Sequence, residues 1–412
     1  MKIAYCSLLL PEEKKLSERS KVRLSGISNH KVTIAEIKGI EDNLKDNVDI
    51  INIINTVNYP DFPQIIFRNE LWNHTQCKEH IDYHVGYINL CGIKYITQFF
   101  NTYKKLDKWI KKQDNKKDIL ICVHNIYLPM MLAVYKLKKK YGIKTCLNTG
   151  DLPSVYGLKS QYKKNFKQFI IENVVDKKIM QIAKEFDSFV FVTEPMAEAF
   201  HVKNKPHVVV ECAYVPTDYK DINVIKNDNY KTVFYAGSIR EEYGISHLLR
   251  AFSLIKSKEY RLVIAGGGAA ENIVRDYAKK DNRISFLGFI PPKEVKRQQL
   301  QSTVLVSPRQ AKLDFVKYSF PSKSVDSLAS GIPYIAHRLP CDPPEYEKYI
   351  NYTTDESDES LMNKIVEICE LSQEDRDNIG EKAQNFILVE KKPELVTKRI
   401  VEMWKHLFEA TL

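Results

Sequence analysis

The sequence has no long apolar run. Its 412 residues are 44% hydrophobic and 28% charged, which is ordinary for a globular protein. No stretch approaches the ~20 apolar residues that a membrane span needs. The first residues, with Ile3–Leu10 as their apolar part, are too short and too lightly charged for a signal peptide and are typical of a buried strand. We therefore expect a cytoplasmic protein.

The chain also lacks paired cysteines and nucleic-acid motifs. None of its eight cysteines belongs to a Cys-x-x-Cys pair, and most lie in apolar, strand-like segments. Isolated thiols of this kind fit a reducing compartment. Zinc-finger spacing, RNA-binding aromatic signatures and basic zippers are absent. We therefore expect the net charge of +10 to attract anionic substrates or anionic lipid, and we expect no nucleic-acid partner.

No metal site is predicted. The only Asp-x-Asp is Asp375–Asp377, in a polar helical stretch. Histidines, a cysteine and an aspartate gather within His74–His84, and His80 and His84 would share a helix face, as zinc ligands can. Because the segment lacks the His-Glu-x-x-His order of a hydrolytic zinc site, we assign it a surface or packing role.

Short apolar runs alternate with helical patterns along the whole chain. The alternation predicts an α/β fold of parallel sheets with helices on both faces. The expected strands are Ile3–Leu10, Val48–Ile54, Ile119–Val123, Lys144–Asn148, Ser188–Val192, Val208–Val210, Thr232–Tyr235, Arg261–Ala265, Ile284–Leu287, Thr303–Val306 and Tyr334–Ile335. The expected helices are Gly92–Lys112, Leu128–Tyr141, Asn165–Glu185, Ile245–Ile255, Ala270–Lys280, Pro292–Leu300, Ser322–Ser330 and Asp358–Leu371.

The length is too great for a single core, so two domains are expected. The stretch 216–230 is polar and lacks apolar periodicity, which marks it as a linker. We predict an N-terminal domain at 1–217, a C-terminal domain at 228–390, and a final helix at 391–412 that crosses back to the first domain. Ligands of doubly wound domains bind at the carboxyl ends of the strands, so a cleft between the domains is the expected site.

The segment 317–333, KYSFPSKSVDSLASGIP, is the most informative stretch. Pro321 suits the first turn of a helix and Ser322 suits its N-terminus. Free backbone N–H groups beside Lys323 would bind an anion, and Asp326 lies within reach of the same ligand. Phosphate together with a carboxylate for sugar hydroxyls indicates a nucleotide-sugar pocket. The alternative is an ordinary helix between two strands.

Several segments together resemble the GT-B glycosyltransferases, in particular the retaining family that builds capsular and other surface polysaccharides in bacteria. The matching segments are Thr149–Pro153, Val192–Met196, Tyr235–Ile239, Tyr243–Ile245, Leu262–Gly268, Phe286–Gly288, Val306–Arg309, Ser319–Lys323, Leu339-Pro340 and Pro344–Tyr346. Their order and spacing carry the resemblance. It implies two Rossmann-like domains facing a central cleft, with a UDP-linked sugar donor on the second domain, a glycan or lipid-linked glycan acceptor on the first, and retention of anomeric configuration.

The resemblance implies that His124 hydrogen-bonds the donor sugar. Because the usual family cation pair is missing, we expect Arg240 and Lys323 to take its place and stabilise the departing diphosphate. Asp151 follows another strand end and would bind or orient the acceptor. The implied donor-binding set is Gly237, Ser238, Gly266, Gly267, Arg309, Ser319, Phe320, Pro321, Ser322, Lys323 and Asp326. Alternatives stay open: a structural histidine at His124, a helix cap at Asp151, an ordinary strand-to-helix turn at the glycines, and a loop-holding role for Arg309.

The chain departs from the family pattern where the family often has Glu-x7-Glu. Tyr318 and Asp326 stand at those positions. Asp326 keeps a carboxylate for the ribose, whereas Tyr318 cannot replace the carboxylate that contacts the sugar. Ser238 and Tyr243 also stand where the family often has cations. These departures support a rival hypothesis, a nucleotide-sugar-binding or scaffold protein on the same fold with weakened catalysis. An epimerase-like or phosphorylase-like enzyme is a third reading.

The stretch Gln161–Lys184 interleaves apolar residues with many lysines. Such a basic amphipathic helix can lie on anionic lipid, and the alternative is a helix packed on its own sheet. We therefore expect three partners: a nucleotide-sugar donor, a glycan or lipid-linked glycan acceptor, and peripheral contact with the inner face of the cell membrane. No cofactor is expected.

Overall fold

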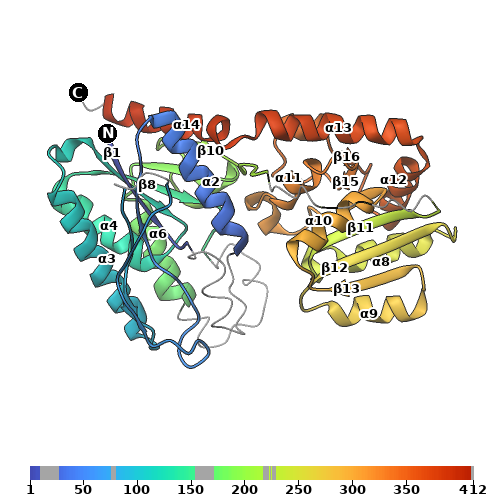
Figure 1. The fold of residues 1–412 in the computed structure, drawn as a ribbon, viewed down its shortest axis with the longest axis horizontal. Helices are drawn as coiled ribbons and strands as arrows, with labels where there is room; N and C mark the ends of the chain where they lie inside the picture. The colour runs from blue at the N-terminus through green and yellow to red at the C-terminus, as the bar shows by residue number, and fades with distance from the viewer. Residues whose placement is uncertain are drawn as a thin grey trace. The chain divides into compact units, whose positions relative to one another are not determined.

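The chain divides into two compact units. A computed structural model describes residues 1–9, 27–75, 80–153, 171–216, 222, 224 and 229–409. The first unit is Met1–Val215 together with Pro393–Leu412, and the second is Pro216–Lys392. The last helix of the chain is therefore part of the first unit (Figure 1).

The first unit is built on an eight-stranded sheet with the order β10-β9-β8-β7-β1-β2-β5-β4. Neighbouring strands are parallel, except that β4 runs antiparallel to β5. The strands are β1 (Lys2–Ser7), β2 (Asp49–Asn52), β4 (Glu70–Trp72), β5 (Asp82–His84), β7 (Ile119–His124), β8 (Lys144–Thr149), β9 (Ser188–Phe191) and β10 (His207–Val209), and β3 (Ile66–Phe67) pairs with β6 (Tyr87–Ile88) apart from this sheet. Apolar runs such as Ile119–Val123 are fully buried, as expected for strands covered on both faces.

The helices of the first unit are α2 (Ile27–Leu44), α3 (Ile93–Lys111), α4 (Leu128–Tyr141), α6 (Lys177–Ala183), α7 (Pro195–Ala199) and α14 (Pro393–Glu409). α2 and α14 pack side by side and share one core with the central strands, in which Trp404 is fully buried. Gly39 permits this approach, because a Cβ there would collide with the backbone of Pro393. The Asn43 amide adds a hydrogen bond of 2.6 Å to the carbonyl oxygen of Glu394.

The second unit is a parallel six-stranded sheet with the order β13-β12-β11-β14-β15-β16. Its strands are β11 (Lys231–Ser238), β12 (Tyr260–Gly267), β13 (Ile284–Gly288), β14 (Val304–Ser307), β15 (Tyr334–Ala336) and β16 (Asn351–Tyr352). Its helices are α8 (Ile245–Leu254), α9 (Glu271–Lys280), α10 (Pro292–Gln301), α11 (Lys323–Leu328), α12 (Asp358–Glu370) and α13 (Gln373–Glu390). After β13 the chain returns to the other side of β11, so the carboxyl ends of β11 and β14 form a topological switch point.

The predicted α/β architecture of two doubly wound domains is confirmed, and each predicted strand is present. The predicted helices were incomplete. α2 and α7 were missed, and α13 was expected only as a polar helical stretch around Asp375–Asp377, without bounds. The prediction for α11 was too long, because this helix has six residues rather than Ser322–Ser330. His80 and His84 do not share a helix, because Asp82–His84 is a strand.

The predicted helix Asn165–Glu185 lies partly outside the described residues. The described part continues from a π-helical turn at Ile171–Asp176 into α6, where Ile179 and Ile182 are buried. These two side chains therefore do not face lipid. No helix in the described part of the chain is long and apolar enough to cross a bilayer.

Candidate functional site

The switch point of the second unit brings together residues from three elements. β11 ends at Gly237-Ser238, β14 is followed by Arg309, and α11 begins at Lys323. The Lys323 ammonium donates a hydrogen bond to the carbonyl oxygen of Ala236 at 3.2 Å. The start of α11 is therefore placed directly against the end of β11, where doubly wound folds bind ligands.

At the ends of β11 and β12, glycine residues let the two backbones approach each other closely. Gly266 has a φ of +137°, and a Cβ there would collide with the carbonyl oxygen of Gly237. The Gly267 carbonyl oxygen accepts the Ile239 N–H at 3.1 Å, and the Ser238 carbonyl oxygen accepts the Tyr235 hydroxyl at 2.9 Å. Only glycine fits such an approach.

Arg309 is the least satisfied charged group of the site. Its side chain is 5% exposed, and Nη1 donates to the Ser319 carbonyl oxygen at 3.1 Å. Its Nε and Nη2 have no hydrogen-bond partner among the described residues, and burial lowers the pKa of its guanidinium. Buried charged donors are costly when unpaired, which favours an anionic ligand here. Arg309 therefore holds the Ser-Phe-Pro-Ser-Lys loop, and its guanidinium also lies 4.9 Å from the ring centre of Phe315 and 5.6 Å from that of Tyr243.

Asp326 interacts with two lysines. Lys323 on α11 and Lys296 on α10 both interact electrostatically with Asp326. Desolvation by the surrounding protein lowers the pKa of both ammonium groups and Asp326 opposes this shift, although the Lys323 side chain itself is exposed. Sequence reasoning missed Lys296, because it belongs to no motif. The one feature of the sequence that indicated Lys296 was its position on a helix that follows the carboxyl end of β13.

Other predicted residues of this loop have different places. Phe320 is 8% exposed and packs its ring 5.5 Å from that of Tyr346, so its side chain belongs to the core. Pro321 is half-buried, and Ser322 is exposed with no capping hydrogen bond to a described residue. With only six residues, α11 has a small dipole, so the expected anion site at its N-terminus is not supported. The remaining candidates for binding an anion are the cationic side chains of the site and the backbone at the ends of β11 and β12.

Arg240 follows β11 by two residues. Its backbone N–H donates to the Ser238 carbonyl oxygen at 3.2 Å, and its side chain is half-buried. This places a third cation, with Arg309 and Lys323, near the ends of the central strands.

The predicted residues of the first unit lie at the carboxyl ends of adjacent strands. His124 ends β7, and desolvation lowers the pKa of its imidazole to about 4, so the ring is neutral at neutral pH. Its Nδ1 lies 3.3 Å from the Asn125 amide nitrogen. Asp151 follows β8, its backbone N–H bonds Thr149 Oγ1 at 3.0 Å, and desolvation raises the pKa of its carboxyl. The helix that Asp151 would cap lies outside the described residues.

A buried polar network lies next to the carboxyl ends of β7 and β8. It was not predicted from the sequence. The Tyr5 hydroxyl donates to Glu36 Oε1 at 2.8 Å, and the Asn148 amide donates to the same oxygen. Desolvation raises the pKa of the Glu36 carboxyl to about 7, against the lowering effect of these hydrogen bonds. Tyr5 in turn lies beside His124, with ring centroids 5.8 Å apart.

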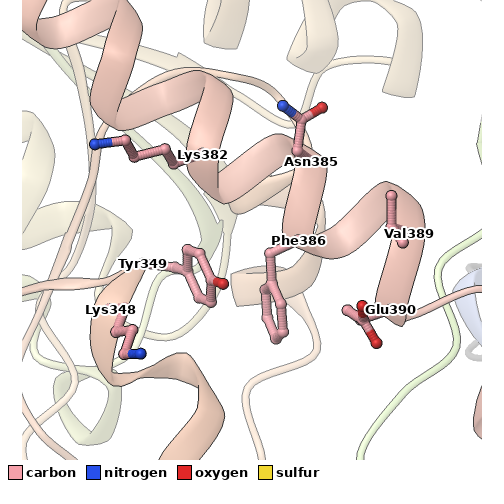
Figure 2. A pocket seen from close by; sticks show the side chains of 7 residues that line it. All are labelled: Lys348, Tyr349, Lys382, Asn385, Phe386, Val389 and Glu390. Carbon is pink, nitrogen blue, oxygen red and sulfur yellow. The ribbon is translucent and has the colours of Figure 1, made fainter.

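A hollow of about 600 Å³ lies elsewhere in the second unit, between α13 and the turn at Pro344–Lys348. Figure 2 shows Tyr349 and Phe386 among the side chains that line it, and the centres of their stacked rings are 4.2 Å apart. Lys348 and Lys382 line the hollow as well. No residue of the predicted site is among its lining residues, so we do not assign the ligand to it.

Comparison with known proteins agrees with this geometry. Residues 219–386, which lie within the second unit, match the family model of glycosyl transferases group 1. A search of curated proteins found no significant match.

Solved structures show the same fold over the full length of the chain. Sucrose-phosphate synthase from Thermosynechococcus elongatus is 14% identical, with 100% of each chain covered and a TM-score of 0.63. A glycosyltransferase from Rickettsia africae is 14% identical, with 99% of each chain covered and a TM-score of 0.62. Anabaena HepE in complex with UDP is 13% identical, with 100% of each chain covered and a TM-score of 0.57. The predicted GT-B fold is thereby confirmed.

Proposed function

We propose that this protein is a retaining glycosyltransferase. It moves a sugar from a UDP-linked donor to a glycan or lipid-linked glycan acceptor on the cytoplasmic side of the membrane, in the synthesis of a surface polysaccharide. The observation that carries the proposal is the Lys323 ammonium held against the end of β11. The buried guanidinium of Arg309, which follows β14 and has two donors left unpaired by the described residues, supports it. The match to the group 1 family model and the UDP complex of HepE support it as well.

The donor diphosphate would lie across the glycine ends of β11 and β12. Lys323, Arg309 and Arg240 would take up the negative charge that develops on the leaving group, which is the largest electrostatic demand of the reaction. Asp326 would accept hydrogen bonds from the ribose hydroxyls. We propose that this set of protein cations, with Lys296 near Asp326, replaces the metal ion that other transferases use.

The first unit would bind the acceptor. Asp151, whose carboxyl pKa is raised by desolvation, is suited to accept a hydrogen bond from the attacking hydroxyl. The neutral His124 imidazole would hydrogen-bond a sugar hydroxyl without adding charge. Holding both substrates in place supplies the proximity that a bimolecular transfer needs. Retention is proposed from the family resemblance.

We propose a peripheral contact with anionic lipid. The described chain offers an apolar ridge on α3, where Ile93, Ile96 and Phe100 are 44%, 57% and 53% exposed. The same side of the helix continues into the exposed Lys104 and Lys108, and apolar side chains next to cations suit an anionic interface. The lysines of 161–170 lie outside the described residues.

The rival function is nucleotide-sugar binding without transfer, and Tyr318 is the residue that favours it. Release of UDP from UDP-sugars by the full chain separates the two. A transferase hydrolyses its bound donor slowly in the absence of acceptor, and Lys323→Ala reduces this release. Tight binding with no release, in the presence of a panel of glycan acceptors, would contradict transfer and favour the binding protein.

A further inference from the structure

Two histidines converge on one buried aspartate in the first unit, far along the chain from the residues assigned to transfer. Asp82 opens β5 opposite Trp72, the last residue of β4. His74 lies two residues after β4 and His80 two residues before Asp82, so the antiparallel pairing brings both imidazoles to the same carboxylate. The side chains of His74, His80 and Asp82 are 3%, 7% and 0% exposed.

The ring nitrogens face separate oxygens of that carboxylate. His74 Nδ1 lies 2.6 Å from Asp82 Oδ2, and His80 Nε2 lies 3.0 Å from Asp82 Oδ1. One ligand atom from each of the three residues lies within 4.8 Å of the others. Ligands around a tetrahedral Zn²⁺ with bonds of about 2.0–2.1 Å are roughly 3.3 Å apart. Binding an ion therefore requires the closest pair, at 2.6 Å, to separate by about 0.7 Å and the most distant pair to approach by at most about 1.5 Å.

An outer carboxylate completes the arrangement. His74 Nε2 lies 3.0 Å from Glu41 Oε1 on α2, and the same oxygen accepts the Val48 N–H at 2.8 Å. A metal-binding histidine usually gives its second N–H to such a carboxylate, which leaves the facing nitrogen free to bind the ion. Here that facing nitrogen is His74 Nδ1, the one directed at Asp82.

The charges of the cluster match a divalent cation. Asp82 is fully buried and the Glu41 side chain is 14% exposed. A divalent cation bound by two neutral imidazoles would balance these two carboxylates.

We propose that His74, His80 and Asp82 bind a divalent transition-metal ion, with Zn²⁺ as the best match to two imidazoles and a carboxylate. Glu41 orients His74 from the outer shell. His84 is not a ligand, because its Nδ1 pairs with the Asn52 amide at 2.8 Å and its ring stacks on Trp72. This replaces the packing role expected from the sequence.

The site is structural rather than catalytic. Asp82 Oδ1 accepts the Ile50 N–H at 2.9 Å, near the amino end of β2, whereas His124 and Asp151 lie at the carboxyl ends of β7 and β8. The ion would fasten the edge strands β4 and β5 to α2. Its presence or absence therefore leaves the proposed transfer chemistry untested, and the two proposals fail separately.

The test measures Zn²⁺ in the full chain, purified without a histidine tag. After dialysis against metal-free buffer we expect about one zinc per chain by elemental analysis, and added Zn²⁺ should raise the thermal midpoint of the stripped protein by mass action. His80→Gln keeps a nitrogen donor for Asp82 but removes the ligand, and it should abolish both effects. Glu41→Gln should weaken Zn²⁺ affinity about 10–100-fold. His406→Gln is the control, since His406 on α14 is 79% exposed.

Absence of retained zinc together with absence of a Zn²⁺-dependent midpoint shift would overturn the site and leave a proton-linked ion pair. Equal zinc binding by His80→Gln and the unaltered chain would overturn it as well, because the metal would then lie elsewhere. If His80→Gln does not fold, the affinity of Glu41→Gln decides: unchanged affinity contradicts the proposal.

Discussion

Lys323 reaches from the start of α11 to the Ala236 carbonyl oxygen, 3.2 Å away at the end of β11. The contact uses one of three ammonium protons, so two remain for a ligand. It holds the cation at the carboxyl end of β11, and the buried Arg309 follows the neighbouring strand β14. The geometry of the proposed diphosphate site depends on this relationship.

Replacing Lys323 should weaken diphosphate binding. A lost hydrogen bond to a charged group is worth roughly 1.5–3 kcal/mol, so Lys323→Ala should reduce UDP affinity about 10–100-fold in calorimetric titration. Lys382→Ala is the matched control, because Lys382 is an exposed lysine of the same unit. Unchanged affinity and turnover in Lys323→Ala would remove this residue from the site.

Asp326 is assigned to the ribose, so Asp326→Ala should weaken binding of free UDP and of UDP-sugars by similar factors. Direct titration of both ligands measures this. The fold should survive, because Asp326 is exposed, and Asp276→Ala on α9, where the side chain is 63% exposed, provides the control. An effect confined to the sugar-bearing donor would show that Asp326 contacts the sugar.

Glu36 should make stability depend on pH. Desolvation raises the pKa of its carboxyl from 4.5 to about 7 in the folded chain. Its contribution is therefore fully present below pH 4.5 and lost as the pH rises through 7. Glu36→Gln cannot ionise, so its stability relative to the unaltered chain should improve by roughly 2 kcal/mol from pH 5 to pH 8. Urea unfolding at both pH values measures the difference, and an equal gap at both would contradict the assignment.

Membrane contact should be salt-sensitive. We expect the full chain to sediment with vesicles that contain phosphatidylglycerol at low salt and to be released as salt rises, since each cation near the surface adds about 1 kcal/mol. Phe100→Ser on α3, and charge reversal of Lys163, Lys164 and Lys167, should each weaken binding. Leu395→Ser, at an exposed position on α14, should not. Equal binding to neutral vesicles, or none at low salt, would rule out this contact.

The strands, and the polar residues at their ends, could be predicted from the sequence because the patterns that mark them involve only neighbouring residues. Apolar runs such as Ile119–Val123 mark buried strands directly. Gly237 and Gly266 stand where a strand must end with backbone exposed, and Arg309 follows β14 in a short polar segment. Such features depend only on neighbours in the chain, so the fold and the places of these residues at strand ends could be predicted, whereas their roles stay predictions.

Features that depend on tertiary packing could not. α2 contains β-branched residues and Gly39, which lower helix propensity, and it is stabilised by α14 from the other end of the chain. Glu36 was missed for the same reason. Lys296 is significant only because it lies near Asp326, and Phe320 was assigned to the ligand although it packs on Tyr346. None of these contacts has a signature in adjacent sequence.

The most direct test of the account is a binding screen of the full chain against UDP-, GDP-, ADP- and CMP-sugars, without added Mg²⁺ or Mn²⁺. A ligand of the native state raises the thermal midpoint by mass action. We predict a concentration-dependent rise with UDP-sugars that is larger than with the other donors and is reduced in Lys323→Ala. No shift with any nucleotide sugar, or a shift that appears only when a divalent metal is added, would contradict the central claim that protein cations at the switch point bind the donor.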